Sequence, residues 1–217
     1  MTRLVSLWTL CSAMLIATIG SANAQITSVS GQVLALLFPP PSVATGALEN
    51  DVYGVVFQEQ SNLVLSAPLT VNAMGPGTYG SHNASNSLVI PTGTPIQSYF
   101  VHFDSVGMPN QHIYYTCTIT FANNILGVIY MENELNASDA PLGAPGTTYA
   151  TNEVWRGLED NNIDLITISN DLKTVTINSR LLNHLDQIRI VTEAVPEPSS
   201  LLALAAGLPL LARLRRR

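Results

Sequence analysis

Three ionisable side chains in predicted strands have the types and spacing that metal binding or acid–base chemistry requires. His102 and Asp104 lie two residues apart, so they would point to one face of a strand, and Glu59 could join them from another strand. A zinc or acid–base site needs a third convergent group and an open position, which the sequence does not supply. We therefore favour ordinary hydrogen bonding of these groups at the edge of the core.

Glu132 and Glu134 form a second acidic pair and would share one face of a strand. Two carboxylates that flank a glycosidic bond are the groups that hydrolyse glycans. Such pairs are usually solvated charges at the end of a strand. A glycan hydrolase is therefore an alternative hypothesis and not the main one.

The acidic segment 159–164 places oxygen ligands at alternate positions, at Asp160, Asn162 and Asp164. Calcium takes roughly six to eight oxygen ligands and often binds in loops of this kind. The segment is not an EF-hand, because Leu165 stands where the loop glycine should be. A solvated turn that enters a strand explains the same residues, so calcium is an alternative and we expect no cofactor.

Trp155 becomes the single tryptophan of the chain once the predicted signal peptide is removed, and it lies beside Arg156 and near Glu153. Sugar rings stack on exposed aromatic side chains, and neighbouring polar groups bind the sugar hydroxyls. These three residues are therefore the candidate ligand loop of a saccharide platform. A loop anchor packed into the core also explains Trp155 and is the interpretation that we favour.

The charge of the chain argues against nucleic-acid binding. The formal net charge is −6, and between Gln25 and Val195 four basic residues stand against fourteen acidic ones, a net charge of −10. A nucleic-acid binder needs a basic stripe that displaces counterions from phosphates. The sequence also lacks a Gly-rich phosphate loop, a Gly-x-Ser-x-Gly elbow, a His-Glu-x-x-His motif and a Cys-x-x-Cys motif. We expect no catalytic residues and a protein that is not an enzyme.

The segments that must position these residues have the pattern of strands. Short runs rich in Val, Ile, Thr, Tyr and Phe alternate with clusters of Gly, Pro, Asn and Ser, and no strong helical stripe is present. The runs 172–178 and 185–192 are predicted to be neighbours in one sheet, and Asn170–Asp171 is predicted to form a hairpin turn. The predicted strands cover 26–37, 52–58, 62–71, 87–91, 96–104, 112–121, 125–131, 163–169, 172–178 and 185–192.

This pattern predicts an all-β domain over residues 25–192, a two-sheet antiparallel β-sandwich of jelly-roll type. Cys117 falls on the apolar face of the 112–121 run, which predicts a buried structural thiol and not a nucleophile. The segment from Glu132 to Asn162 breaks the strand pattern and is predicted to be a long loop. Long loops on rigid scaffolds often bind ligands, so this loop is the first candidate for function.

Both ends of the chain carry hydrophobic targeting segments. Arg3 is followed by the apolar run Leu4–Ile19 and by small residues that include Ala22 and Ala24, the layout of a signal peptide over residues 1–24 with cleavage after Ala24. The other end, 193–217, contains Pro196, Glu197 and Pro198, then an uncharged stretch, then Arg213, Arg215, Arg216 and Arg217. The positive-inside rule keeps such an arginine cluster in the cytoplasm and the preceding domain outside.

These C-terminal residues resemble the PEP-CTERM sorting signal of exported proteins in Gram-negative bacteria that make exopolysaccharide. The resemblance covers about the last 23 residues and consists of a Pro-Glu-Pro motif, a hydrophobic transmembrane helix and an arginine cluster in that order. It implies recognition and cleavage by a membrane transpeptidase-like enzyme, the exosortase. Residues 135–149 and 186–190 are also similar to segments of some PEP-CTERM proteins, which implies a family-specific sandwich of unknown activity.

The sequence thus predicts a protein that is exported by the Sec translocon and cut by signal peptidase. We expect it to be anchored transiently in the inner membrane, with its domain in the periplasm, and then sorted to the cell surface or extracellular matrix. Its expected role there is structural or adhesive in an exopolysaccharide biofilm. A carbohydrate-binding module that uses the Glu132–Asn162 segment, with exopolysaccharide as its partner, is the alternative.

Overall fold

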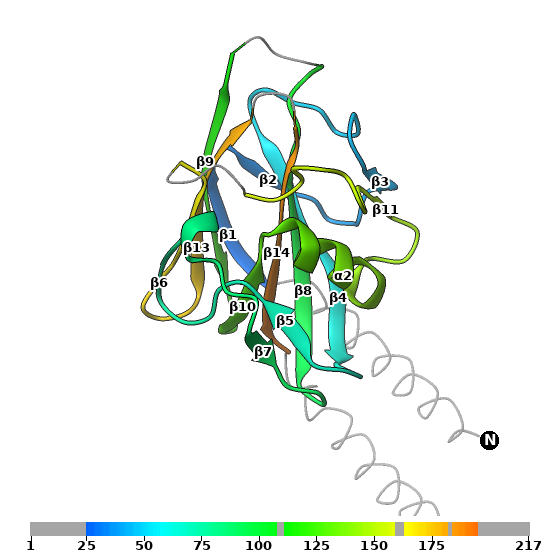
Figure 1. The fold of residues 1–217 in the computed structure, drawn as a ribbon, viewed down its shortest axis with the longest axis vertical. Coiled ribbons are helices and arrows are strands. Elements are labelled where there is room, and N and C mark those ends of the chain that lie inside the picture. Colours follow the sequence, from blue (N-terminus) through cyan, green and yellow to red (C-terminus); the bar gives the residue numbers. More distant parts are fainter. Residues whose placement is uncertain (1–24, 108–110, 159–162, 182–183, 195–217) are drawn as a thin grey trace, which may run out of the picture.

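The computed structural model describes residues 25–107, 111–158, 163–181 and 184–194, and within them the chain is predominantly β, as the sequence predicted (Figure 1). Most strands fall in two five-stranded sheets. The first sheet has the order β1 (Ile26–Gly31), β9 (Ile113–Phe121), β13 (Thr174–Leu181), β12 (Leu165–Ile168) and β6 (Gly77–Tyr79). The second has the order β10 (Ile125–Ile129), β14 (Asp186–Glu193), β8 (Pro95–Phe103), β4 (Gly54–Val64) and β2 (Val33–Ala35).

Two small sheets and two helical segments complete the described chain. The small sheets pair β11 (Thr148–Tyr149) with β3 (Ser42–Val43) and β5 (Leu69–Val71) with β7 (Leu88–Ile90). A 3-10 turn, η1, covers Ser81–Asn83, and an α-helix, α2, covers Glu132–Leu142. Pairing is antiparallel except for β2 with β4 and β3 with β11, so the prediction of purely antiparallel sheets was wrong at these two edges.

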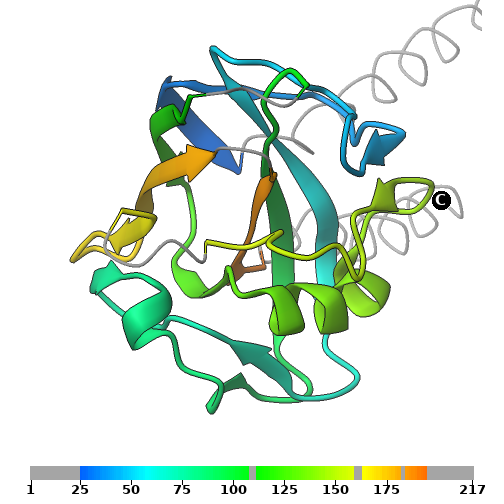
Figure 2. The same ribbon diagram turned by 45° about the horizontal axis from the view of Figure 1, so that its top comes forward.

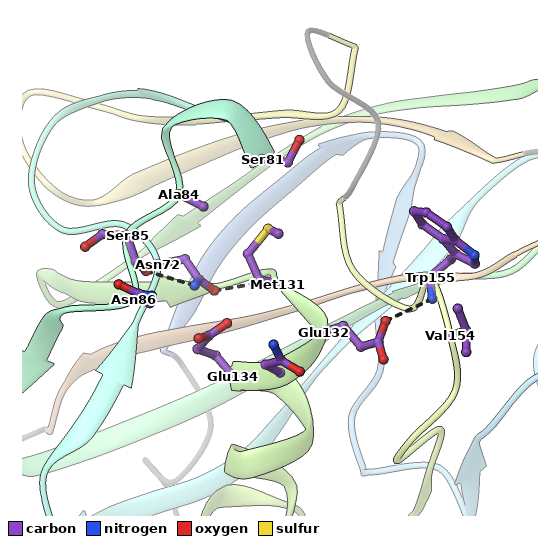
Figure 3. A pocket seen from close by; sticks show the side chains of 11 residues that line it. Asn72, Ser81, Ala84, Ser85, Asn86, Met131, Glu132, Glu134, Val154 and Trp155 are labelled. Atoms are coloured by element: carbon purple, nitrogen blue, oxygen red, sulfur yellow. Dashed lines mark hydrogen bonds between the residues drawn. The ribbon is translucent and has the colours of Figure 1, made fainter.

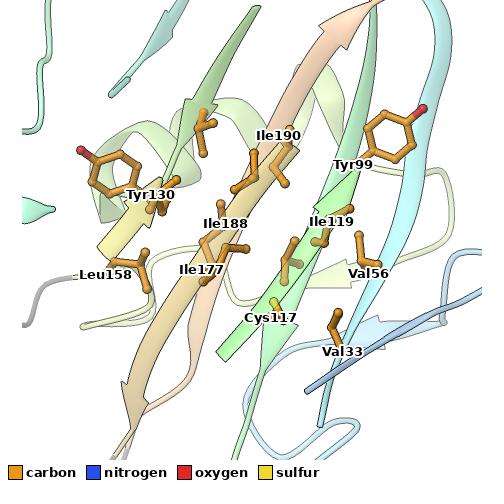
Figure 4. Close-up of a cluster of buried hydrophobic side chains, with 14 of the residues drawn as sticks. Val33, Val56, Tyr99, Cys117, Ile119, Tyr130, Leu158, Ile177, Ile188 and Ile190 are labelled. Atoms are coloured by element: carbon orange, nitrogen blue, oxygen red, sulfur yellow. The ribbon is translucent and has the colours of Figure 1, made fainter. Parts of the chain in front are cut away.

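The main core lies between the two five-stranded sheets. Strand β9 shows how the sequence builds it, because Tyr115, Cys117, Ile119 and Phe121 are buried while the threonines between them are not fully buried. Figure 4 shows Cys117 and Ile119 facing this cluster together with Ile177 of β13 and Ile188 of β14. The predicted buried thiol is therefore confirmed, and burial raises the pKa of Cys117 to about 12.

The prediction that the last two strands are neighbours in one sheet was wrong. Strand β13 belongs to the first sheet and pairs with β9, whereas β14 belongs to the second sheet and pairs with β8 and β10. Both strands carry isoleucines at alternate positions because these side chains meet across the core. The predicted hairpin at Asn170–Asp171 is confirmed, since β12 and β13 pair antiparallel on either side of it.

The central strands of the second sheet are buried on both faces. Almost every residue of β8 and β14 is buried, with only the first residue of β8 and the last of β14 exposed. A second apolar cluster, which includes Phe57, Phe100 and Val191, fills the space between the outer face of this sheet and Leu135 and Leu142 of α2. Figure 2 shows α2 lying over this sheet.

Helix α2 corrects the prediction of a long loop after Glu132. The asparagines, Pro141 and Gly143 are turn-forming residues, and only two leucines mark the buried side of the helix, so the helical period is weak. Tertiary contacts stabilise the helix where the sequence pattern alone would not. The Asn72 side-chain oxygen accepts the backbone N–H groups of Tyr130 (2.9 Å) and Met131 (3.0 Å), at the start of the helix, and the Gly143 N–H closes its end on the Asp139 carbonyl (2.9 Å).

Candidate functional site

A cavity of about 480 Å³ lies where the start of α2, the loop before Arg156 and the η1 region meet. Its walls mix amides, hydroxyls and carboxylates with a few apolar groups and one indole (Figure 3). The lining residues are Asn72, Ser81, Ala84, Ser85, Asn86, Met131, Glu132, Asn133, Glu134, Val154 and Trp155. We call this cavity the Trp155 pocket.

Two sets of residues that the sequence singled out separately meet in the Trp155 pocket. Glu132, Glu134 and Trp155 line one cavity, although the sequence placed the two glutamates on a strand. They lie in the first turn of α2, where carboxylates interact favourably with the helix dipole. Residues two apart on a helix do not share a face, so the predicted side-by-side pair was wrong. Figure 3 shows the Glu132 carboxylate directed toward Trp155 and the Glu134 carboxylate directed toward the Asn72 and Asn86 side.

Trp155 is half exposed, with 52% of its surface accessible, so the interpretation as a buried loop anchor was wrong. Its φ is +65°, in the left-handed region that a bulky L-residue rarely adopts. The Trp155 backbone N–H donates to Glu132 Oε2 at 3.2 Å, and its ring lies 6.2 Å from the His184 ring. The residue with this strained backbone thus places its indole at the edge of the pocket.

Arg156 anchors that strained backbone from the inside. Its side chain is fully buried, so the prediction that Arg156 contacts a ligand in an exposed loop was wrong. The guanidinium donates to Asp139 Oδ2 (2.6 Å), Asn136 Oδ1 (2.8 Å) and Gln187 Oε1 (3.0 Å), which ties the loop to α2 and to β14. Glu153, the third predicted ligand residue, is exposed but does not line the pocket.

A second buried arginine extends this network across the outer face of the second sheet. Arg189 binds Glu59 with two hydrogen bonds, at 2.7 and 2.8 Å, and reaches Asp139 Oδ1 at 3.1 Å. Its guanidinium also lies over the ring of Phe100, 4.8 Å from the centroid. Burial alone would lower the pKa of Arg189, but the charge of Glu59 raises it.

Asp139 is the residue that both arginines share. Burial alone would raise the pKa of Asp139, but the hydrogen bond and charge of Arg156 and the charge of Arg189 bring it below its ordinary value. Thr151 adds a hydrogen bond of 2.6 Å to the same carboxylate. One side chain of α2 thus connects the helix, the Trp155 loop and strand β14.

The predicted trio of His102, Asp104 and Glu59 does not converge on a ligand. The His102 Nε2 bonds the Ala47 carbonyl (2.8 Å) and its Nδ1 bonds Gln187 (3.0 Å), and burial lowers its pKa to about 4. The Asp104 carboxylate accepts the Gly46 N–H at 2.8 Å, and burial raises its pKa to about 6. Glu59 pairs with Arg189 instead. Each group is satisfied internally, as the interpretation that we favoured from the sequence proposed.

Of the predicted calcium ligands, Asp160 and Asn162 lie outside the described residues. Asp164 is buried and accepts the Arg180 N–H at 2.8 Å, and burial raises its pKa to about 7. Within the part of the chain that the structure describes, no group of three or more potential metal ligands gathers. A buried carboxylate in a hydrogen bond to the backbone is the role observed for Asp164.

The predicted terminal signals also lie outside the described residues. These are the cleavage residues Ala22 and Ala24, the motif Pro196, Glu197 and Pro198, and the cluster Arg213, Arg215, Arg216 and Arg217. Strand β14 runs one residue past the predicted domain end at 192. Across the four described ranges, no helix has the length and apolar character needed to cross a membrane.

Several residues of the Trp155 pocket carried no signal in the sequence. Asn72, Ser85 and Asn86 lie outside the named strands and helices, and only the fold brings them opposite Trp155. Comparison with known proteins adds nothing to this description, because no family, no curated protein and no solved structure matches the chain.

Proposed function

We propose that this protein is exported and sorted to the cell surface or extracellular matrix, where it has a structural or adhesive and non-catalytic role. In this proposal residues 1–24 are a signal peptide, and the β domain is a jelly-roll-like sandwich. The Pro196–Pro198 motif, the hydrophobic segment and the arginine cluster form a sorting signal. The layout of these two ends carries the proposal. Sec translocon, signal peptidase and an exosortase-type enzyme are the implied partners.

The intact mass and location of the native protein test this proposal. The comparison is between the wild type and a variant with Pro196→Ala and Glu197→Ala. The expected wild type lacks both ends and lies outside the cell, while the variant stays membrane-bound at the longer mass. If both proteins keep the tail in the inner membrane, the sorting proposal fails.

A specific observation favours a second function, that of a carbohydrate-binding module. The Trp155 pocket combines a half-exposed indole with amides and hydroxyls, which are the groups that bind the face and the hydroxyls of a sugar ring. The strained backbone at Trp155 and the buried Arg156 beneath it support a role for the indole beyond packing. Exopolysaccharide is the natural ligand in the proposed location.

Retention of the purified full-length protein on the exopolysaccharide of its own host tests this second function. Trp155→Ala should lose retention, whereas Tyr114→Ala should keep it, because Tyr114 is a similarly exposed aromatic residue of β9 that does not line the pocket. Equal retention of both variants would refute a role for the pocket. Turnover of the glycan that disappears in Glu132→Gln or Glu134→Gln would instead establish the hydrolase alternative.

A further inference from the structure

The charge of the Trp155 pocket determines which sugars it can take. Two carboxylates, those of Glu132 and Glu134, line the cavity, and its other lining residues are neutral. Neither lysine nor arginine is among them. A ligand carboxylate placed in this cavity would therefore meet negative charge with no lining cation to offset it.

The arginine closest in sequence does not change this charge. Arg156 follows Trp155 directly, but its guanidinium is fully buried and pairs with Asp139 at 2.6 Å. Its other hydrogen bonds, to Asn136 and Gln187, also point into the protein. The guanidinium is therefore committed to the network beneath the loop and is not directed to a ligand.

The two glutamates have different tasks in the pocket. Glu132 accepts the Trp155 backbone N–H, so it positions the indole as well as adding charge. The Glu134 side chain forms no hydrogen bond or ion pair with any described residue, and Figure 3 shows its carboxylate on the side of Asn72 and Asn86. A carboxylate at this place can accept hydrogen bonds from sugar hydroxyls or from an ammonium group, and the amides can both donate hydrogen bonds to sugar hydroxyls and accept them.

We propose that the Trp155 pocket binds neutral or amino-bearing sugar residues and rejects uronic acids. The inference rests on the carbohydrate-binding function proposed above and adds the class of ligand. A uronate carboxylate about 6 Å from Glu134 would be repelled, with screening by salt, enough to weaken binding by several-fold and by up to about tenfold. An ammonium group at the same place would be attracted by the Glu134 carboxylate, which would strengthen binding.

The test measures binding of the full-length protein to a neutral β-glucan, to partly deacetylated chitosan and to alginate, a uronate polymer. The wild type should bind the glucan and the chitosan, and its affinity for alginate should be several-fold to about tenfold weaker. Glu134→Gln should raise alginate binding and lower chitosan binding while leaving glucan binding in place. Glu153→Gln is the matched control, because it removes the same charge from an exposed side chain that does not line the pocket.

The outcomes separate this inference from the function on which it rests. Alginate binding as tight as glucan binding, lost in Trp155→Ala, would overturn the charge inference while the carbohydrate-binding function stands. Equal effects of Glu134→Gln and Glu153→Gln would also overturn it, because the selectivity would then come from the acidic protein as a whole. Binding to none of the three polymers would overturn the charge inference, and the carbohydrate-binding function would fall with it only if retention on the host exopolysaccharide were also absent.

Discussion

Replacing Asp139 by Asn should destabilise the fold far more than an ordinary surface substitution. The side chain of Asp139 is 7% exposed and serves two arginines whose side chains are fully buried. Among the described residues it is the only acidic partner of Arg156. Asn keeps the shape and part of the hydrogen bonding but removes the charge, so a buried guanidinium loses its counterion.

The structure allows the size of this effect to be worked out. Removing one partner of a buried ion pair costs about 3–5 kcal/mol, because the remaining charge stays desolvated. Arg189 retains Glu59, so the loss arises mainly at Arg156. For a domain of this size, such a loss corresponds to a fall in Tm of roughly 6–20 °C.

Urea denaturation of the wild type and of Asp139→Asn measures the free energy of unfolding directly. Glu153→Gln provides the control, since the same change of charge on an exposed side chain should alter stability by less than about 0.5 kcal/mol. The double variant Asp139→Asn with Arg156→Met should lose less than the two single variants added together, because it leaves no unpaired guanidinium at Arg156. A loss in Asp139→Asn below about 1 kcal/mol would refute the network as described.

Three further predictions follow from burial and backbone geometry. His102 has its pKa lowered to about 4, so the unfolded chain takes up that proton first and stability is lost as pH falls from 6.5 toward 4. Asp104 has its pKa raised to about 6, so the folded chain takes up that proton first and stability is gained from about pH 6 toward 4. Denaturant titrations at pH 7 and pH 4 measure both effects as changes in the free energy of unfolding. On going from pH 7 to 4, His102→Gln should gain on the order of 2 kcal/mol relative to wild type, and Asp104→Asn should lose a similar amount. Changes of the opposite sign would contradict both pKa shifts. Gly54→Ala should cost more than about 2 kcal/mol, because the added methyl would overlap the Phe103 ring and lie 2.6 Å from the His102 carbonyl oxygen. A Tm equal to wild type would show that this contact is not tight. The free energy of unfolding of Trp155→Gly should exceed that of Trp155→Ala by about 1 kcal/mol, because glycine accepts the φ of +65° without strain. The reverse order would show that the backbone at this position is not strained.

Local patterns in the sequence were enough to predict the all-β class and the burial of individual strands. The alternation in β9 located Cys117 correctly, and turn residues located the hairpin between β12 and β13. These features depend on neighbours in the sequence. The period of two also assigned most strands to nearly their observed positions.

Features that depend on distant residues could not be predicted in this way. Glu59 and Arg189 are 130 positions apart, and nothing local marks Arg156 or Arg189 as buried. Helix α2 forms on a weakly amphipathic segment because its buried leucines pack against the apolar cluster on the outer face of the second sheet. The Trp155 pocket likewise exists only because the fold brings α2, the Trp155 loop and the η1 region together.

The most direct test of the central claim is the distribution of the protein between extracellular matrix and medium in its own host. Wild type, Trp155→Ala and Tyr114→Ala are expressed at native levels and quantified in cells, matrix and medium. The account predicts that wild type and Tyr114→Ala are retained at the cell surface or in the matrix, while Trp155→Ala is exported equally well but released into the medium. A wild type that stays in the inner membrane, or a Trp155→Ala variant retained as fully as wild type, would contradict it.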